Sequence, residues 1–235
     1  MENPLLALDL TLFDVVALTW FFICWMGFQY FADHSRWHKR SLTIQINEYR
    51  LEWMRQMLQR DVRMVDTTLL GNLLTAIGFF ASTTILVLGG LFALLANADI
   101  AMQALTSLPF AKQTSLTVWE FKVLLLMSIF VHAFFKFGWA FRLNNYCSIL
   151  IGAAPPPSTL SPERERYAHK TAQLSINAGK HFNRGLRTYF FGLAAIGWFY
   201  HPLALVIVST IVVCVLYRRE FSSAALFSLV QAEEN

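Results

Sequence analysis

The sequence predicts an all-helical integral membrane protein, and three observations support that fold class. Long apolar segments recur along the 235 residues, hydrophobic residues make up 56% of the chain, and charged residues make up only 14%. Soluble domains carry roughly 25% charged residues, and a helix needs about 20 apolar residues to cross a bilayer. We therefore expect a single membrane domain over residues 1–235. It should be a bundle of five transmembrane helices with amphipathic cytoplasmic helices, or alternatively of four.

The five predicted spans are apolar segments, at about residues 12–31, 69–96, 118–141, 186–200 and 203–217. His201-Pro202 separates the last two, which are each shorter than a typical span. The alternative joins them into one long span that is kinked at Pro202. We prefer two spans, because a tight turn at His201-Pro202 returns Arg218 and Arg219 to the side that holds the other basic residues.

The basic residues predict which way the chain crosses the membrane. Of 19 Lys and Arg residues, seven lie between Arg36 and Arg63 and seven between Arg142 and Arg187, whereas Lys112 is alone in segment 97–117. Loops rich in Lys and Arg face the cytoplasm. We therefore place loops 32–68 and 142–185 in the cytoplasm of the cell (inner) membrane, with the N-terminus outside and the C-terminus inside. Attraction to anionic lipid also explains these loops, so we expect no nucleic-acid partner.

Two cytoplasmic segments have a helical pattern. Residues 47–65 alternate aromatic and Met residues with Arg at helical spacing, which predicts an amphipathic helix at the membrane or against a partner. The proline-rich segment 153–158 should end the third helix. Ser161 and Pro162 then form a start signal for a polar helix over residues 162–184.

The third span contains three polar residues, Lys122, His132 and Lys136, which helical geometry places on one face. A charge near the bilayer centre costs about 2.5–3.5 kcal/mol even by the most lenient scale, so this face should turn toward the bundle or a water-filled cavity. It predicts a binding site or a pathway for an anion, a proton or a headgroup. The alternative is that both lysines reach the interfaces and a neutral His132 bonds a neighbouring helix.

Depth in the membrane suggests partners for the two lysines. Asp14 in the first span suits Lys122, and Asn72 or Asp66 in or beside the second suits Lys136.

A second set of polar residues flanks the inner ends of the third and fourth spans. It consists of Arg142, Asn145, Tyr146, His181, Asn183, Arg184 and Arg187. The planar fork of Arg suits phosphate and carboxylate groups, so we expect a cytoplasmic site for an anion or a lipid headgroup. The alternative is ordinary anchoring of basic residues to lipid phosphates.

The sequence predicts no catalytic and no metal site. The three cysteines, Cys24, Cys147 and Cys214, have no paired spacing, and HExxH, CxxC, nucleophile-elbow and phosphate-loop motifs are missing from the sequence. No cofactor is specified, and an enzyme is the least favoured class.

Several segments resemble one membrane family in the same order along the chain. They are residues 72–74, 79–86, 134–142 with Asn145-Tyr146, 181–191 and 216–221. The family is catalogued as domain of unknown function 599, and the resemblance covers about Asn72 to Ser223. It implies a multi-span membrane protein and supplies no activity. Its second-span block often has Arg before the Asn, where this chain has Gly71, so no role of that arginine carries over.

Together these observations favour a transport or channel-like protein with a polar site on the third span. The alternative is a membrane scaffold or anionic-lipid-binding module with a basic cytoplasmic face. The expected partners are membrane lipids, a second copy of the chain and a cytoplasmic protein.

Overall fold

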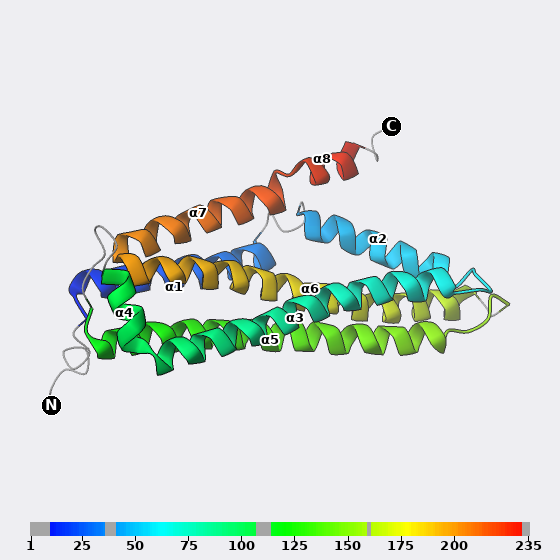
Figure 1. Cartoon of the computed structure of the whole chain (residues 1–235). Helices are drawn as coiled ribbons and strands as arrows, with labels where there is room; N and C mark the ends of the chain where they lie inside the picture. The colour runs from blue at the N-terminus through cyan, green and yellow to red at the C-terminus, as the bar shows by residue number, and fades with distance from the viewer. Residues whose placement is uncertain (1–9, 36–40, 107–113, 159–160, 232–235) are drawn as a thin grey trace, which may run out of the picture. The chain divides into compact units, whose positions relative to one another are not determined.

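The computed structural model describes residues 10–35, 41–106, 114–158 and 161–231, which are mostly helical and include no strand. The predicted loop residues 36–40, and 107–113 with Lys112, lie outside the described residues. The helices are α1 (Leu12–His34), α2 (Leu42–Met57), α3 (Met64–Ala96), α4 (Ala98–Thr106), α5 (Leu116–Gly152), α6 (Ser161–Tyr200), α7 (Pro202–Phe221) and α8 (Ala224–Gln231) (Figure 1).

Within the described ranges, four segments are long and apolar enough to cross a membrane, judged by length and composition. They are Leu12–His34, Met64–Ala96, Leu116–Gly152 and Pro202–Leu229. Many large apolar side chains on these helices are exposed, among them Leu86 at 76% and Phe92 at 60%. Apolar surface on this scale is typical of helices that face lipid. The all-helical fold predicted from the sequence is thus confirmed for the described residues, and its long apolar helices are those expected of a membrane protein.

The chain divides into two compact units, which we describe separately. Unit 1 comprises residues 1–35, 84–133 and 186–218, and unit 2 comprises residues 36–83, 134–185 and 219–235. The long helices α3, α5 and α6 contribute residues to both units.

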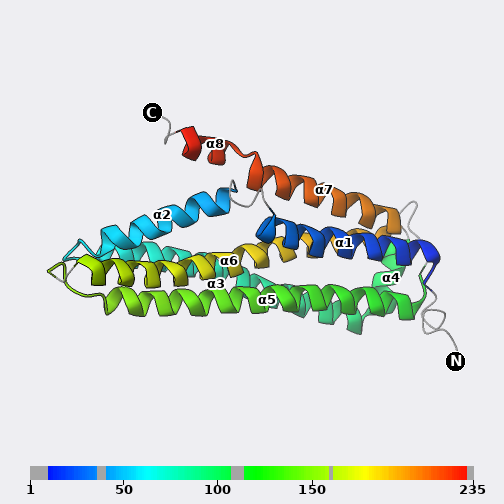
Figure 2. The same ribbon diagram turned by 180° about the vertical axis from the view of Figure 1, so that it is seen from behind.

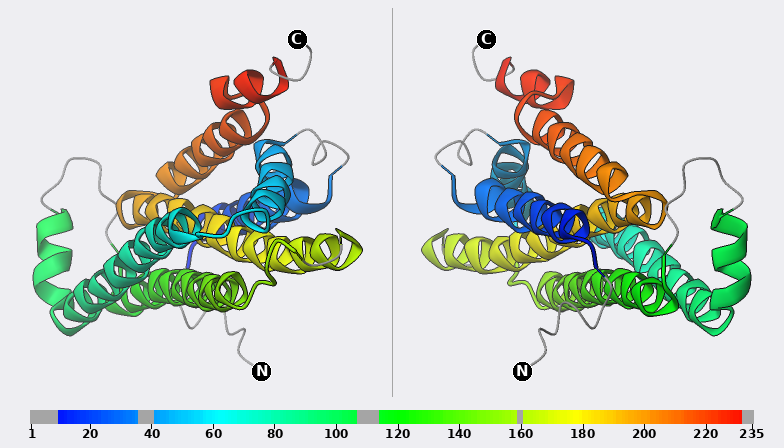
Figure 3. Two further views of the ribbon diagram at one scale, coloured as in Figure 1. Left: turned by 90° about the vertical axis from the view of Figure 1, so that its right-hand side faces the viewer. Right: turned by 90° about the vertical axis from the view of Figure 1, so that its left-hand side faces the viewer.

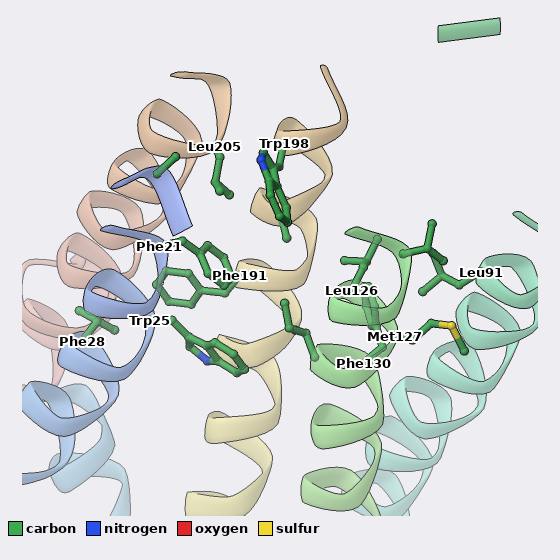
Figure 4. Packing of buried hydrophobic residues seen from close by; sticks show 14 of the residues in the cluster. Phe21, Trp25, Phe28, Leu91, Leu126, Met127, Phe130, Phe191, Trp198 and Leu205 are labelled. Carbon is green, nitrogen blue, oxygen red and sulfur yellow. The ribbon is translucent and has the colours of Figure 1, made fainter. Parts of the chain in front are cut away.

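Aromatic side chains from α1 and α6 form the centre of unit 1. The ring of Phe191 lies 6.0 Å from that of Phe21 and 6.5 Å from that of Trp25, measured between centroids. Phe130 of α5 and Leu91 of α3 belong to the same buried cluster. Figure 4 shows Phe21 and Trp25 of α1 directed toward α6. Aromatic pairs at such distances stabilise a core beyond the area that they bury.

A tight reversal joins α6 to α7 in unit 1 (Figure 2). His201 stands between the two helices, and its N–H donates to the carbonyl of Gly197 over 3.1 Å. A Cβ at Gly197 would lie 3.3 Å from the carbonyl carbon of Ala204, so the missing side chain lets α7 begin close to α6. The helix break expected at His201-Pro202 is therefore present. Figure 3 shows α4 standing across the end of α3 in the same unit.

Helix α6 differs from the prediction, because residues 162–184 and 186–200 form one continuous helix of 40 residues. The sequence has no proline between them, so no local signal ends the helix at Gly185. A Cβ at Gly185 would lie 2.6 Å from Cε1 of Phe137, so glycine lets α5 and α6 approach each other. Helix α5 likewise extends beyond residue 141 to Gly152, three residues before Pro155.

Unit 2 has its own apolar core. Met54, Met57 and Leu58 of the α2 segment are buried with Cys147 and Ile151 of α5. The predicted amphipathic helix 47–65 is shifted toward the N-terminus, since α2 spans Leu42–Met57. Its start is fixed by Ser41, whose Oγ accepts from the N–H of Ile44 over 3.3 Å. On α2, Met57 is fully buried, whereas Ile46 and Tyr49 are exposed.

Candidate functional site

Unit 1 contains an apolar groove between α1 and α7, which we call the α1–α7 groove. Its volume is about 510 Å³, within the range of roughly 300–1,000 Å³ that is usual for small-molecule sites. The α1 wall consists of Trp20, Ile23, Cys24, Gly27, Phe28 and Phe31. The α7 wall consists of Thr210, Val213, Cys214 and Tyr217. Almost every group that it offers a ligand is therefore apolar.

Specific contacts close the α1–α7 groove at both ends. At one end the indole Nε1–H of Trp20 donates to Oγ1 of Thr210 over 3.0 Å. At the other, the rings of Phe31 and Tyr217 lie 6.2 Å apart. From the first contact to the second, the residue numbers increase on both helices, so α1 and α7 run in the same direction along the groove. Between the ends, a Cβ built on Gly27 would meet no atom within 4 Å, so the glycine leaves space there.

Lys122 is buried in unit 1 and is held by Trp198 of α6. Its Nζ donates to the backbone carbonyl of Trp198 over 3.0 Å and lies 5.1 Å from the indole centroid. The indole Nε1–H of Trp198 donates in turn to Oδ1 of Asp14 over 3.0 Å. Asp14 also caps α1 through Thr11. The structure thus brings Lys122 and its suggested partner Asp14 to one tryptophan, and we call the three residues the Lys122 cluster.

The other residues of the predicted polar face, and the partners suggested for Lys136, have different surroundings. His132 is exposed, and its ring lies 6.1 Å from that of Trp25 in unit 1. Lys136 belongs to unit 2, where its charge acts on His181. Asn72 is exposed on α3 and has no hydrogen bond or ion pair to the part of the chain that is described. Asp66 is fully buried and pairs with Arg60 over 2.6 Å.

The residues of the predicted cytoplasmic site interact with different partners. Arg187 forms a buried ion pair with Asp33 in unit 1, with Nη1 and Oδ1 3.1 Å apart. In unit 2, Asn183 donates to Oγ1 of Thr43 over 3.3 Å.

Two further residues of that predicted site, Arg142 and Tyr146, contact each other. Arg142 donates from Nε to the hydroxyl of Tyr146 over 2.6 Å, on the exposed side of α5. Asn145 is exposed beside them. The assignment of the whole set to one anion or lipid-headgroup site stays a prediction.

In unit 2, several basic side chains affect the pKa of His181. Burial lowers the pKa of His181, and the charges of Lys136, Arg184 and Lys180 lower it further. The ring Nδ1 of His181 is buried without a hydrogen-bond partner among the described residues. A neutral imidazole is therefore favoured at this position.

On the surface of unit 2, a hydrogen bond from Arg55 lowers the pKa of Glu165. Arg55 reaches that carboxylate from Nη2 over 2.6 Å and from Nε over 3.0 Å.

A second hollow, of about 40 Å³, lies within unit 2 and is lined by Arg50, Asn144 and Gly179 among others. Sequence reasoning missed it, because its walls come from α2, α3, α5 and α6, which are far apart along the chain. The one local signal was Arg50 itself, an arginine between Tyr49 and Leu51 in a segment with an apolar face. The α1–α7 groove was missed for the same reason, although Gly27 among aromatic residues was a hint.

Among the residues that the structure describes, no group of three or more His, Cys, Asp and Glu side chains gathers as a metal site. The described side chains offer buried cations, indole groups and an apolar groove. Buried cations suit anions, and an apolar groove suits hydrocarbon chains.

The fold and these sites define a multi-helix protein with several helices that are long and apolar enough to cross a membrane. A family model described as "Protein of unknown function, DUF599" matches residues 16–225. The match covers most of the sequence, so the chain belongs to this family, and the resemblance found in the sequence is confirmed. No curated protein and no solved structure matches the chain.

Proposed function

We propose that this chain is a lipid-binding membrane protein that holds one hydrocarbon tail of an anionic lipid in the α1–α7 groove. The observation that carries the proposal is the groove itself: about 510 Å³, walled by two apolar helices and closed at both ends by specific contacts. A polar solute would lose hydrogen bonds to water in such a groove and gain few in return. A hydrocarbon chain has no polar group that could be left without a partner there.

The length of the groove supports a single lipid tail. From Trp20 to Phe31 the α1 wall rises about 16 Å at roughly 1.5 Å per residue. The hydrocarbon core of a bilayer is about 30 Å thick, so the groove is about as long as one leaflet. Phe31 and Tyr217 mark its predicted cytoplasmic end, where aromatic side chains prefer the interface.

Arg218 supports the choice of an anionic lipid. It is exposed and follows Tyr217 at the predicted cytoplasmic end of the groove. An exposed guanidinium next to the tail site suits the phosphate of a headgroup. Arg187 is less suited to this role, because its ion pair with Asp33 leaves it only 7% exposed.

The same direction of α1 and α7 supports five spans. With the N-terminus outside, α1, α3 and α5 cross the membrane in turn and leave the chain inside. Helix α7 then parallels α1 only if the last part of α6, residues 186–200, crosses as well. This topology places the C-terminus, α2 and the first half of α6 at the cytoplasmic face, as the basic loops predict. Helix α2 and the first half of α6 correspond to the segments that the sequence predicts to be amphipathic.

The test compares two glycine variants. Gly27→Leu places a side chain in the groove, whereas Gly89→Leu adds the same side chain on α3, where a Cβ also meets no atom within 4 Å. Both proteins are purified in mild detergent, and the bound lipid is measured by native mass spectrometry. We expect Gly27→Leu to lose the bound lipid and Gly89→Leu to keep it.

A third variant tests the headgroup. Arg218→Gln should reduce the preference for anionic over zwitterionic lipid about fivefold, because one basic residue near a membrane surface contributes about 1 kcal/mol. Equal lipid content in Gly27→Leu and the wild type would refute the tail site. An unchanged preference in Arg218→Gln would refute the headgroup contact.

Transport is the second candidate, and the Lys122 cluster is the observation that favours it. Burying a lysine in a candidate membrane span is costly, and such residues often mark a binding site or a path for charge. Flux of anions or protons into liposomes should then fall in Lys122→Met. It should also fall in His132→Ala and Lys136→Ala, which change the other two residues of the predicted polar face. Flux that none of the three variants changes would exclude this function.

A further inference from the structure

The small hollow of unit 2, which we call the Arg50 cavity, contains an unusual arrangement of polar groups. Its volume is about 40 Å³. The polar lining comes from Arg50 of α2 and Asn144 of α5, whereas Ile77, Ala178 and Phe182 supply apolar wall. One cation and one amide therefore meet in an otherwise apolar enclosure.

Helix α6 holds the guanidinium of Arg50 in place. Its Nη1 donates to the backbone oxygen of Ser175 and, over 3.4 Å, to Oγ of the same residue. Gly179, one turn further along α6, makes this position accessible. A Cβ at Gly179 would lie 2.7 Å from Cζ of Arg50, so any larger residue displaces the guanidinium.

The charge of Arg50 is not balanced by a carboxylate. Within the described ranges, its hydrogen bonds go only to the neutral oxygens of Ser175, and it forms no ion pair. Burial lowers the pKa of Arg50, yet a guanidinium keeps its proton under all ordinary conditions. A largely buried cation without a counter-charge is unfavourable, and an anion in the cavity removes that penalty.

Asn144 is the second, independent observation. It is 3% exposed, lines the cavity, and has an amide oxygen without a hydrogen-bond partner among the described residues. Its amide carries an acceptor and a donor group on opposite sides. Turning the amide by about half a rotation presents the NH₂ group, which can donate to an anion beside Arg50.

We propose that the Arg50 cavity binds a small monovalent inorganic anion of the size of chloride. About 40 Å³ holds roughly three water-sized positions, at 10–15 Å³ each. The single positive charge matches a monovalent ion, whereas phosphate dianion would bring surplus charge against apolar walls. The bound ion connects α2 to α5 and α6, so it stabilises unit 2. This site is independent of the lipid groove in unit 1.

The experiment measures thermal unfolding of the full-length protein in mild detergent. Sodium chloride is compared with sodium gluconate at equal ionic strength, because gluconate is too large for the cavity. We expect a saturable rise of about 2–4 °C in the unfolding temperature with chloride. Arg50→Met should abolish the chloride effect.

Arg55→Met is the matched control, because this arginine lies on the same helix but is exposed and paired with Glu165. It should keep the whole chloride effect. Asn144→Leu provides a second variant should Arg50→Met fail to fold, and it should weaken the effect. Bromide soaked into the wild-type protein should give density beside Arg50. Equal stability in chloride and gluconate, or a chloride effect that survives both Arg50→Met and Asn144→Leu, would overturn the proposal.

Discussion

Arg187 of α6 and Asp33 of α1 form a buried ion pair between elements that are 154 residues apart in the chain. Their side chains are 7% and 8% exposed, and the guanidinium also lies 5.8 Å from the ring of Phe28. The pair fixes the end of α1 against α6. Its position next to the α1–α7 groove makes it part of the support for the Phe28 wall.

Breaking this pair should be strongly destabilising. Asp33→Leu or Arg187→Met alone leaves one buried charge without this partner and should lower the free energy of unfolding by about 3–5 kcal/mol. The double variant Asp33→Leu/Arg187→Met removes both charges and should recover most of that loss. Denaturant unfolding in detergent measures all three. A double variant that is as unstable as the sum of the singles would show that the pair is not the cause.

The Lys122 cluster predicts a difference between two tryptophans. Trp198→Phe removes the N–H that donates to Asp14 and should cost about 1–3 kcal/mol, because a buried acceptor loses its donor. Trp119→Phe is the control: Trp119 is equally buried, but its Nε1 has no hydrogen-bond partner among the described residues. Thermal unfolding should separate the two variants, and equal losses would mean that only ring volume matters.

Gly185 and Gly138 should respond to alanine with opposite signs. At Gly185 a methyl group would lie 2.6 Å from the ring of Phe137, and forcing α5 and α6 apart should cost about 1–3 kcal/mol. At Gly138 the methyl group meets no atom within 4 Å, so alanine should stabilise the helix by about 0.5–1 kcal/mol. Thermal unfolding of both variants measures the difference. Destabilisation by Gly138→Ala would show that the space beside Gly138 is filled by a neighbouring side chain.

Stability should fall on acidification in two steps. The pKa of His181 is lowered in the folded state, so the unfolded chain binds the extra proton first, and stability declines as the pH falls below about 6.5. The pKa of Glu165 is also lowered, and its contribution is present above pH 4.5 and disappears as the pH falls through its folded value. Unfolding temperatures recorded against pH measure both steps.

His181→Asn should remove the upper step and leave the lower one. Lys136→Met, which removes the largest of the charge effects on His181, should only reduce the upper step. An upper step of full size in His181→Asn would assign it to another group.

The sequence was sufficient for the class, the family and the main helices, because apolar length and proline position are local signals. Pro155 ends α5 within three residues, and His201-Pro202 separates α6 from α7 as expected. The close approach of α5 and α6 at Gly185 was not predictable, since it depends on the ring of Phe137 from another helix. The depth argument matched Asp14 to Lys122. The structure places each of them in a hydrogen bond with Trp198, a residue that the depth argument does not identify.

The candidate sites were harder to predict than the helices. Residue type alone made Arg187 a candidate for a headgroup, whereas its environment makes it the partner of Asp33. The α1–α7 groove and the Arg50 cavity arise from surfaces of helices that meet only after folding. No spacing in the sequence reports such volumes, because a void depends on what several distant side chains leave unfilled.

The two contacts of α1 with the end of the chain have a consequence for synthesis. Trp20 and Thr210 are 190 residues apart, and Asp14 and Trp198 are 184 apart. A ribosome therefore releases the first helix long before these partners exist, and the face with Phe21 and Trp25 must wait in the translocon or in lipid until the chain has been synthesised past Thr210. Nascent chains stalled before residue 186 should keep that face open to crosslinking by insertion machinery, and chains that extend well beyond residue 210 should lose it.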